Sequence, residues 1–203
     1  MSAKQKFLRH IYPLLRFLSG IFKWNTRIFQ ENVTPFVSFY TLHAETPSGE
    51  NFSFERLRGK KILIVNTASE CGYTAQLGGL TELKKRLPHI EILAFPSNDF
   101  KNQEPGDDDA VVTFCSITYG INFPLFKKCI VKKESGQHPV FHWLSHATQN
   151  GWNNRAPIWN FCKYILDENG RLTHYTEHAV DPLDVRLIQA LSDTITDTSD
   201  GSR

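Results

Sequence analysis

Two apolar segments separated by a helical repeat constrain the fold of this chain more than any other feature. KKILIVN (60–66) is almost continuously apolar, as in a strand buried on both faces, and IEILAFP (90–96) is similar. Between them, leucines recur at helical spacing and predict a helix from about residue 74 to 87. Strand–helix–strand units close by a right-handed crossover, so the two strands are expected to be parallel.

The segments around this unit complete a recognisable order of elements. FVSFYTLH (36–43) and NFSF (51–54) flank a Pro-Ser-Gly turn and predict an N-terminal hairpin. Acidic first-turn residues and a closing Gly120 predict a helix over GDDDAVVTFCSITYG, and HPVFHWLSHA predicts a short one.

FCKYILDENGRLTHYTEH (161–178) predicts two strands around a turn that ends at Asn169-Gly170. DPLDVRLIQALSD predicts a final helix with Asp181 at its N-cap and Pro182 at its first position. A parallel unit, then an antiparallel hairpin and a closing helix, is the order of a thioredoxin-like fold. We therefore predict an α/β protein with a central mixed sheet flanked by helices.

Composition and charge exclude several classes of protein. The chain has 203 residues, 40% of them hydrophobic and 22% charged, which is typical of a soluble domain. Its four cysteines form no CxxC pair, so neither a disulfide scaffold, a zinc ribbon nor a dithiol motif is present. Residues 1–31 carry +5 of the net charge of +2, and the remaining chain is therefore −3 (2 minus 5). An acidic folded part is not a nucleic-acid-binding surface.

A lone cysteine, Cys71, lies where the first predicted central strand meets the following helix. Open α/β sheets bind their ligands at this carboxyl edge. Backbone N–H groups and the dipole of the following helix would favour the thiolate, the reactive form of cysteine. The alternative is a structural thiol that ends a strand inside the core.

Four segments in the same order together resemble the glutathione peroxidase family in its cysteine-containing form: NTASECGYTAQLGGL, ILAFPSNDFKNQEPG, FCSITYGINFPLF and WNFCKYILDENG. The resemblance runs from about residue 36 to 195. It implies that Cys71 is the peroxide-reducing nucleophile and that Gln103, Trp159 and Asn160 complete the catalytic site. It also places Cys115 at the position of the resolving cysteine in thioredoxin-dependent members.

These residue types suit the implied chemistry. A glutamine amide and an indole N–H are donors that can hold a thiolate or a departing oxygen anion. A second thiol can trap the sulfenic acid formed at the first as a disulfide. Each residue also has a plainer interpretation: Gln103 capping a turn, Trp159 as an aromatic anchor, and Cys115 as a buried helical thiol. Cys129 and Cys162 are assigned to packing.

The sequence departs from the family pattern at two places. Ser97 and Asp99, in FPSNDF, replace the Cys and Gln of the common FPCNQF, which leaves the local electrostatics open. The segment between HATQNGW and WNF is too short for the assembly loop of tetrameric members. We therefore expect a monomer or weak dimer, and thioredoxin rather than glutathione as reductant.

The expected function is that of an antioxidant thiol peroxidase. It would reduce hydrogen peroxide and organic or lipid hydroperoxides through a sulfenic acid and be recycled by thioredoxin or glutathione, without a cofactor. The alternatives are a redox-signalling protein that relays oxidation to a partner and a silent thioredoxin-like binding module. His138, His142 and His146 recur at a spacing of four, and we interpret them as a solvated helix face rather than a metal site.

A basic leader (1–34) precedes the peroxidase domain (35–196), and a flexible tail (197–203) follows it. Apolar residues from Phe7 to Phe22 recur at helical spacing, with Arg9, Arg16 and Lys23 opposite them. This pattern predicts an interfacial helix, residues 7–23, on an anionic membrane surface. The protein would then be cytoplasmic and peripheral on a membrane. An organelle transit peptide and a helix that docks on the domain are the alternatives.

Overall fold

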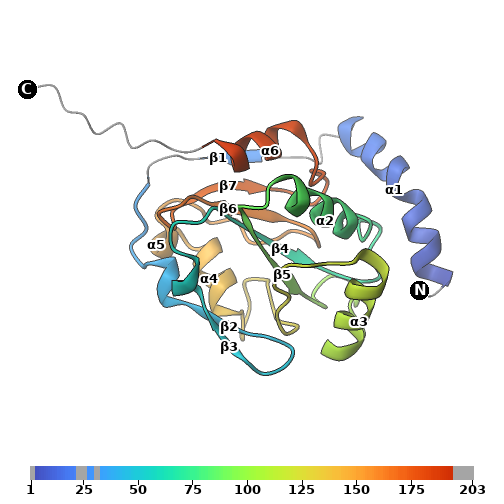
Figure 1. Ribbon diagram of the computed structural model, residues 1–203, viewed down its shortest axis with the longest axis horizontal. Helices are drawn as coiled ribbons and strands as arrows, with labels where there is room; N and C mark the ends of the chain where they lie inside the picture. The colour runs from blue at the N-terminus through green and yellow to red at the C-terminus, as the bar shows by residue number, and fades with distance from the viewer. Residues whose placement is uncertain (1–2, 22–26, 30–32, 194–203) are drawn as a thin grey trace, which may run out of the picture.

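The computed structural model describes residues 3–21, 27–29 and 33–193 (Figure 1). Its centre is a five-stranded sheet in the order β1-β7-β6-β4-β5. The bounds of these strands are β1 Arg27–Phe29, β4 Ile62–Thr67, β5 Glu91–Pro96, β6 Lys163–Leu166 and β7 Leu172–Thr176. Only β4 and β5 pair in parallel, and the other neighbours are antiparallel. The predicted mixed sheet and its thioredoxin-like order are confirmed.

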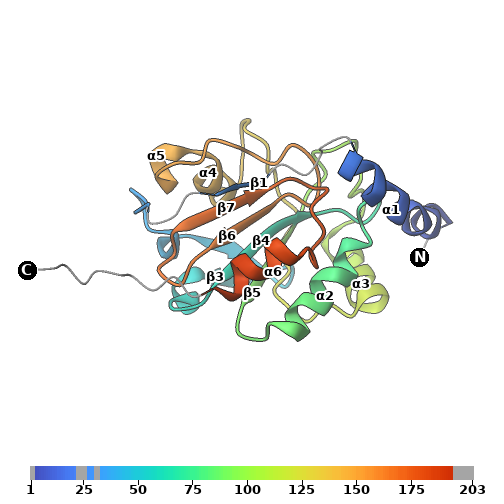
Figure 2. The ribbon, with the colours of Figure 1, turned by 90° about the horizontal axis from the view of Figure 1, so that it is seen from above.

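Helices cover both faces of this sheet (Figures 1 and 2). One face carries α2 (Gln76–Arg86), α3 (Asp108–Tyr119) and α6 (Val185–Ser192), and the other carries α4 (Pro139–Ser145) and α5 (Ala147–Asn150). Because helices lie on both sides, every residue of β4 is buried, as its continuous apolar sequence predicted. The sheet separates two clusters of buried apolar side chains.

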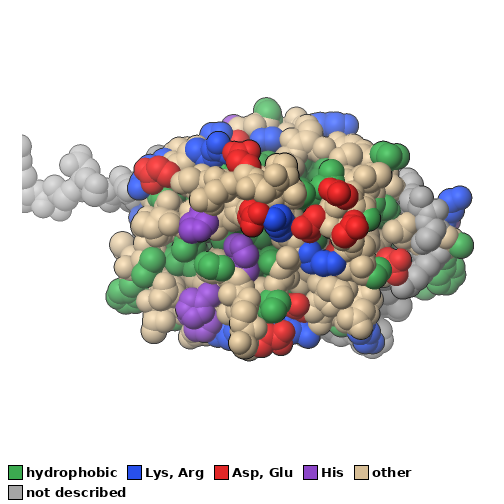
Figure 3. Space-filling model, turned by 90° about the horizontal axis from the view of Figure 1, so that it is seen from below, with side chains coloured by type: hydrophobic (Ala, Val, Ile, Leu, Met, Phe, Trp, Pro, Cys, Tyr) green, Lys and Arg blue, Asp and Glu red, His purple; other side chains and the backbone are tan. Residues whose placement is uncertain are grey.

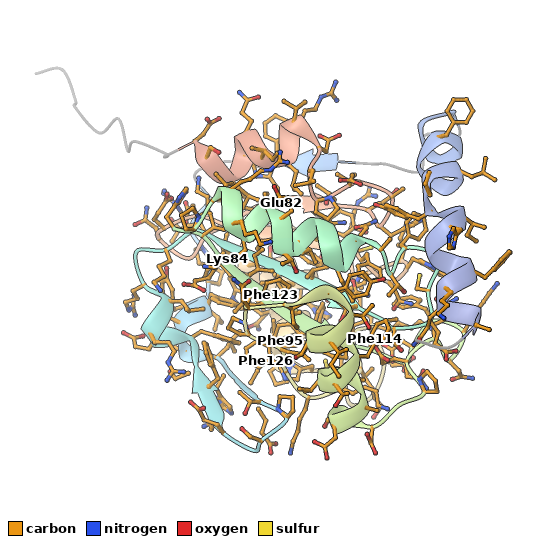
Figure 4. All side chains as sticks on the ribbon, turned by 45° about the vertical axis from the view of Figure 1, so that its right-hand side comes forward. Glu82, Lys84, Phe95, Phe114, Phe123 and Phe126 are labelled. Atoms are coloured by element: carbon orange, nitrogen blue, oxygen red, sulfur yellow. The ribbon has the colours of Figure 1, made fainter. Side chains whose placement is uncertain are left out.

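Aromatic rings fill much of the cluster on the α4 side. Phe95 of β5 stacks on Phe126 with ring centroids 4.5 Å apart, and it meets Phe141 of α4 edge-on at 5.4 Å (Figure 4 labels the first two). Phe39 stacks on Phe54 at 4.9 Å in the same cluster. Phe54 also meets Phe126 edge-on at 5.9 Å, and this contact joins the N-terminal segment to the rings that pack on β5.

The N-terminal hairpin exists, but its strands are shorter than predicted. They are β2 (His43–Glu45) and β3 (Asn51–Ser53), which form a separate two-stranded sheet. The prediction of a strand over residues 36–43 was wrong, because Phe39–Thr41 is a 3-10 helix (η1), and a second one, η2, spans Phe54–Leu57. Two consecutive residues of η1 are buried, which an alternating strand does not allow.

Capping residues explain where helices α3 and α6 begin and where α3 ends. The Asp107 carboxylate accepts from the Ala110 N–H at 2.9 Å at the start of α3, and Gly120 ends that helix in a left-handed conformation (φ 58°). The predicted cap of the last helix was wrong: Asp184, not Asp181, caps α6, by accepting from Arg186 N–H at 2.9 Å. Asp181 instead accepts from Leu183 N–H in the preceding turn.

The basic leader contributes two elements that lie against the domain. Helix α1 spans Ala3–Ile21, with Pro13 inside it. The Tyr12 hydroxyl donates to Asp181 at 2.8 Å, and its ring meets Tyr73 edge-on at 6.2 Å. Strand β1, which the sequence did not predict, pairs with β7 at the edge of the sheet. Residues 22–26 and 194–203, and with them the tail, lie outside the described part of the chain.

Candidate active site

Cys71 lies in the turn after β4, at the carboxyl edge of the sheet, and its side chain is only 1% exposed. The Tyr73 N–H donates to its Sγ at 3.4 Å. Thr74 fixes the turn, because its Oγ1 accepts from the Cys71 N–H at 3.0 Å and donates to the Ala68 carbonyl at 2.9 Å. Thr74 was not among the site residues predicted from the sequence.

Burial raises the pKa of the Cys71 thiol, and hydrogen bonds from the Tyr73 N–H and from the Trp159 and Asn160 side chains oppose that increase. The backbone N–H that the sequence predicted beside the thiol is that of Tyr73, in the turn that leads into α2 at Gln76. The donors that favour the thiolate are therefore a turn amide and two side chains from a distant loop.

Trp159 and Asn160 lie in the loop before β6, and both side chains act to lower the pKa of the thiol. Asn160 is fully buried, and its Nδ2 donates to Oε1 of Gln103 at 3.0 Å. The Gln103 carbonyl in turn accepts from the Glu70 N–H at 2.9 Å, next to Cys71. The structure thus brings together the four residues predicted from sequence, although they come from three separate loops.

Neighbouring side chains and strained backbone hold the glutamine and tryptophan loops. Phe100 lies 5.6 Å from the Trp159 ring, and the Lys101 ammonium lies 5.6 Å from the same ring centre. Lys101 and Asn102 both have left-handed backbones (φ 54° and 51°) immediately before Gln103. Non-glycine residues with positive φ are uncommon and cluster at functional sites.

Asn66 is a further site residue that the motif analysis missed. It is fully buried in β4, and its Nδ2 donates to the Trp159 carbonyl at 3.0 Å, while its own carbonyl accepts from the Phe161 N–H at 2.6 Å. Phe161 itself has a left-handed backbone with φ 72°. The available signal was an asparagine directly after the apolar residues ILIV of KKILIVN.

Glu104, next to Gln103, places a buried carboxyl group beside the site. It is 1% exposed, and its Oε1 has no hydrogen-bond partner. Burial raises the pKa of Glu104 to about 7, against the lowering effects of hydrogen bonds from Ser69 and the charge of Lys128. A carboxyl group that changes charge near neutral pH therefore adjoins the Cys71 loop.

Cys115 lies in α3 and is 2% exposed, in the same apolar cluster as Cys71. Both thiols are free. Burial and the nearby Glu104 carboxylate raise the pKa of Cys115 to about 12, so this thiol is inert in the arrangement described here. Cys129 is half-buried and Cys162 is buried in packing positions.

Asp99, the departure that left the electrostatics open, makes local structural contacts. Its Oδ2 accepts from the backbone N–H groups of Val131 and Lys132 at 2.7 and 3.0 Å. Its own N–H donates to the Ser97 hydroxyl at 3.3 Å. Asp99 thus anchors the loop after β5 to residues 131–132, and Ser97 supports Asp99.

Histidines gather on the face shown in Figure 3. His142 and His146 stack with ring centroids 4.0 Å apart, and the half-buried His138 caps the start of α4. Within the described ranges, no group of three or more His, Cys, Asp or Glu side chains is arranged to hold a metal ion.

Comparison with known proteins adds an independent observation. Residues 39–145 match the family profile described as Glutathione peroxidase. The Glutathione peroxidase homolog BsaA of Bacillus subtilis is 39% identical over 138 residues, covering 67% of this chain and 86% of that protein. The Glutathione peroxidase-like peroxiredoxin 2 of Saccharomyces cerevisiae is 40% identical over 137 residues, covering 66% and 84%. The solved structure of Trgpx in apo form superposes with a TM-score of 0.59 at 25% identity, covering 78% of this chain and 98% of that one.

Proposed function

This chain belongs to the glutathione peroxidase family and is a thiol peroxidase, and we propose that Cys71 is the nucleophile that reduces its peroxide substrate. The observation that carries this assignment is the convergence of donors on one thiol. The Tyr73 N–H donates to the Cys71 sulfur, the Trp159 and Asn160 side chains act to lower the pKa of that buried thiol, and Asn160 is bonded to Gln103. A purely structural cysteine has no need of a turn amide and two polar side chains from a distant loop beside its sulfur.

The proposed reaction begins when the Cys71 thiolate attacks one peroxide oxygen. The S–O bond forms as the O–O bond breaks, which leaves a sulfenic acid on Cys71 and an alcohol or water that takes up the thiol's proton. Asn160 donates to Oε1 of Gln103, so the amide Nε2 of Gln103 is left to donate to the departing oxygen. The Trp159 indole is the second such donor.

Cys115 is proposed to resolve the sulfenic acid. Its thiol would attack the Cys71 sulfur, form a disulfide and release water, and a dithiol or two monothiols would then reduce that disulfide. The name of the yeast relative, a peroxiredoxin, favours thioredoxin over glutathione as the reductant. Steady-state turnover with each reductant in parallel separates the two, and equal rates with glutathione alone would remove this preference.

The assignment of the nucleophile is tested by Cys71→Ser. Serine is nearly isosteric but forms no comparable anion at neutral pH, so we expect peroxide reduction to be abolished with the fold intact. Cys129→Ser, at a half-buried thiol outside the site, is the matched control and should retain activity. Residual activity of roughly a tenth or more in Cys71→Ser would show that another group is the nucleophile.

We also propose that α1 binds an anionic membrane surface and brings lipid hydroperoxides to this site. Phe7, Leu14 and Phe17 of α1 are 64%, 57% and 67% exposed, and they recur at helical spacing. Several of the side chains drawn on this helix project away from the domain in Figure 4. Residues 3–21 contain four Lys or Arg and no acid, which suits anionic lipid head groups. Among the described residues, no helix is long and apolar enough to span a bilayer.

Vesicle co-sedimentation tests this role. The double variant Phe7→Ser/Phe17→Ser should lose binding to vesicles that contain anionic lipid, whereas the wild-type protein should bind less at high salt. Ile117→Ser is the matched control, because Ile117 is an 81% exposed apolar residue on α3. Equal partitioning of wild type and double variant would exclude α1 as the anchor without affecting the peroxidase assignment. We further propose a cytoplasmic location and a monomeric or weakly dimeric state.

A further inference from the structure

Lys163, the first residue of β6, is completely buried, which is rare for a lysine. Its ammonium donates to Oε1 of Gln76 at 2.6 Å, to the Phe161 carbonyl at 2.8 Å and to the Val180 carbonyl at 2.7 Å. An ammonium has three N–H donors, so these three hydrogen bonds use all of them. The partners belong to three different segments of the chain.

The bond to Phe161 restrains the loop that carries Trp159 and Asn160. Phe161 directly follows Asn160 and has a left-handed backbone, a conformation that persists in a bulky residue only when its surroundings fix it. Lys163 holds its carbonyl, and the carbonyl of Asn66 holds its N–H at 2.6 Å. The direction in which the chain leaves Asn160 therefore depends on Lys163.

The bond to Gln76 restrains the other half of the site. Gln76 is the first residue of α2, and its N–H donates to the Tyr73 carbonyl at 2.9 Å. Tyr73 supplies the N–H that contacts the Cys71 sulfur. One ammonium thus connects the turn that carries the thiol with the loop that carries two of its donors.

From this arrangement we propose that Lys163 is a positioning residue for the peroxidase reaction: it fixes the Cys71 turn and the 159–161 loop relative to each other so that Trp159 and Asn160 donate to the thiolate. The inference rests on the proposed role of Cys71 as nucleophile. A purely structural role would tie β6 to α2 without any effect on the reactivity of the sulfur.

Lys163→Met tests the inference, with Lys61→Met as the matched control. Lys61 is also buried, at 4% exposure, and its ammonium donates to backbone carbonyls at the end of α6. Lys61 precedes β4 and Cys71 follows it, so the two residues lie at opposite ends of that strand. Both variants remove one buried ammonium and keep an unbranched apolar side chain of similar length.

Three measurements are made on both variants and the wild type: thermal unfolding, the pH dependence of Cys71 alkylation read by mass spectrometry, and the stopped-flow rate of Cys71 oxidation by hydrogen peroxide. We expect both variants to lose thermal stability. Only Lys163→Met should shift Cys71 alkylation to higher pH and slow oxidation by roughly tenfold or more, as loss of a preorganised donor does.

An unchanged alkylation profile and oxidation rate in a folded Lys163→Met protein would overturn the inference and leave a structural tie. If that variant does not fold, Lys163→Arg replaces it, since it keeps the cation but moves its donors. The same kinetic shift is expected there, and unaltered kinetics would again overturn the proposal. Failure of wild-type Cys71 to react with peroxide would instead refute the proposed function, while the alkylation profile would still report on Lys163.

Discussion

Replacing Glu104 by glutamine should change how the stability of this protein depends on pH. Glu104 is 1% exposed, one of its oxygens has no partner, and burial raises its pKa from 4.5 to about 7. In the unfolded chain the carboxyl group loses its proton near its ordinary pKa, whereas the folded protein retains that proton to higher pH. The folded state therefore binds more protons in this window, so the stability that protonation confers is complete below pH 4.5 and is lost as pH rises through 7.

The size of the effect follows from the shift in pKa. Each unit corresponds to about 1.4 kcal/mol, so the rise of Glu104 from 4.5 to about 7 amounts to at most about 3 kcal/mol across the window. A glutamine cannot ionise and lacks this contribution. Relative to wild type, Glu104→Gln should thus gain up to about 3 kcal/mol in the free energy of unfolding between pH 4.5 and pH 8.

Urea unfolding of both proteins at several pH values measures this difference, and comparing the two cancels the other titrating groups. Glu82→Gln, at a partly exposed position on α2 labelled in Figure 4, controls for the general effect of the substitution. If the difference between wild type and Glu104→Gln is the same at pH 4.5 and pH 8, then burial does not hold this carboxyl group protonated, and the reasoning is wrong.

Three further outcomes are expected. Cys115→Ser should consume one equivalent of peroxide but then stop turning over with thioredoxin. Peptide mapping of the oxidised wild-type protein should find Cys71 linked to Cys115. Full turnover by the variant would exclude Cys115 as the resolving cysteine. Burial lowers the pKa of His138 to about 4, so the stability that the neutral imidazole contributes is lost as pH falls from 6.5 to 4. His138→Asn keeps an acceptor for the Val140 N–H and should reduce this loss of stability. Unfolding of both proteins at pH 7 and pH 4.5 measures the difference. Leu144→Ala, at a fully buried position in the apolar cluster on the α4 side of the sheet, should cost about 2–5 kcal/mol in the free energy of unfolding, measured with urea. Cys71 lies in the other cluster, so its alkylation should not change, and a shift in alkylation would contradict the independence of the two clusters.

The elements that the sequence predicted well are those whose burial follows one simple period. β4 and β5 are apolar throughout because both their faces are covered, and α2 repeats leucine toward the sheet. The sequence pattern gave a wrong prediction at residues 36–43, where tertiary packing buries consecutive side chains instead of alternate ones. Phe39 and Tyr40 are both buried by neighbouring aromatic rings, so the segment turns as a 3-10 helix instead of extending.

Sequence motifs likewise predicted one part of the site and missed another. Cys71, Gln103, Trp159 and Asn160 were found because four motifs occur in a fixed order, not because any of them is distinctive alone. The residues that hold these four in place could not be predicted from motifs. Asn66 bonds a residue 93 positions away, and Lys163 bonds one 87 positions away. Both are buried polar residues in mostly apolar strands, and only the folded structure shows which oxygens and nitrogens are their hydrogen-bond partners.

The two thiols are held in different ways, and this difference indicates which of them moves if Cys115 resolves Cys71. The Cys71 turn is fixed by the hydrogen bonds of the Thr74 hydroxyl, whereas Cys115 is held by apolar packing in the middle of α3. A disulfide requires Cα atoms within about 7 Å and a thiolate on the attacking sulfur. Burial opposes that thiolate at Cys115, and exposing the thiol to solvent removes the opposition. Unwinding α3 would therefore both free the backbone of Cys115 and activate its sulfur, while the donors around Cys71 stay in place.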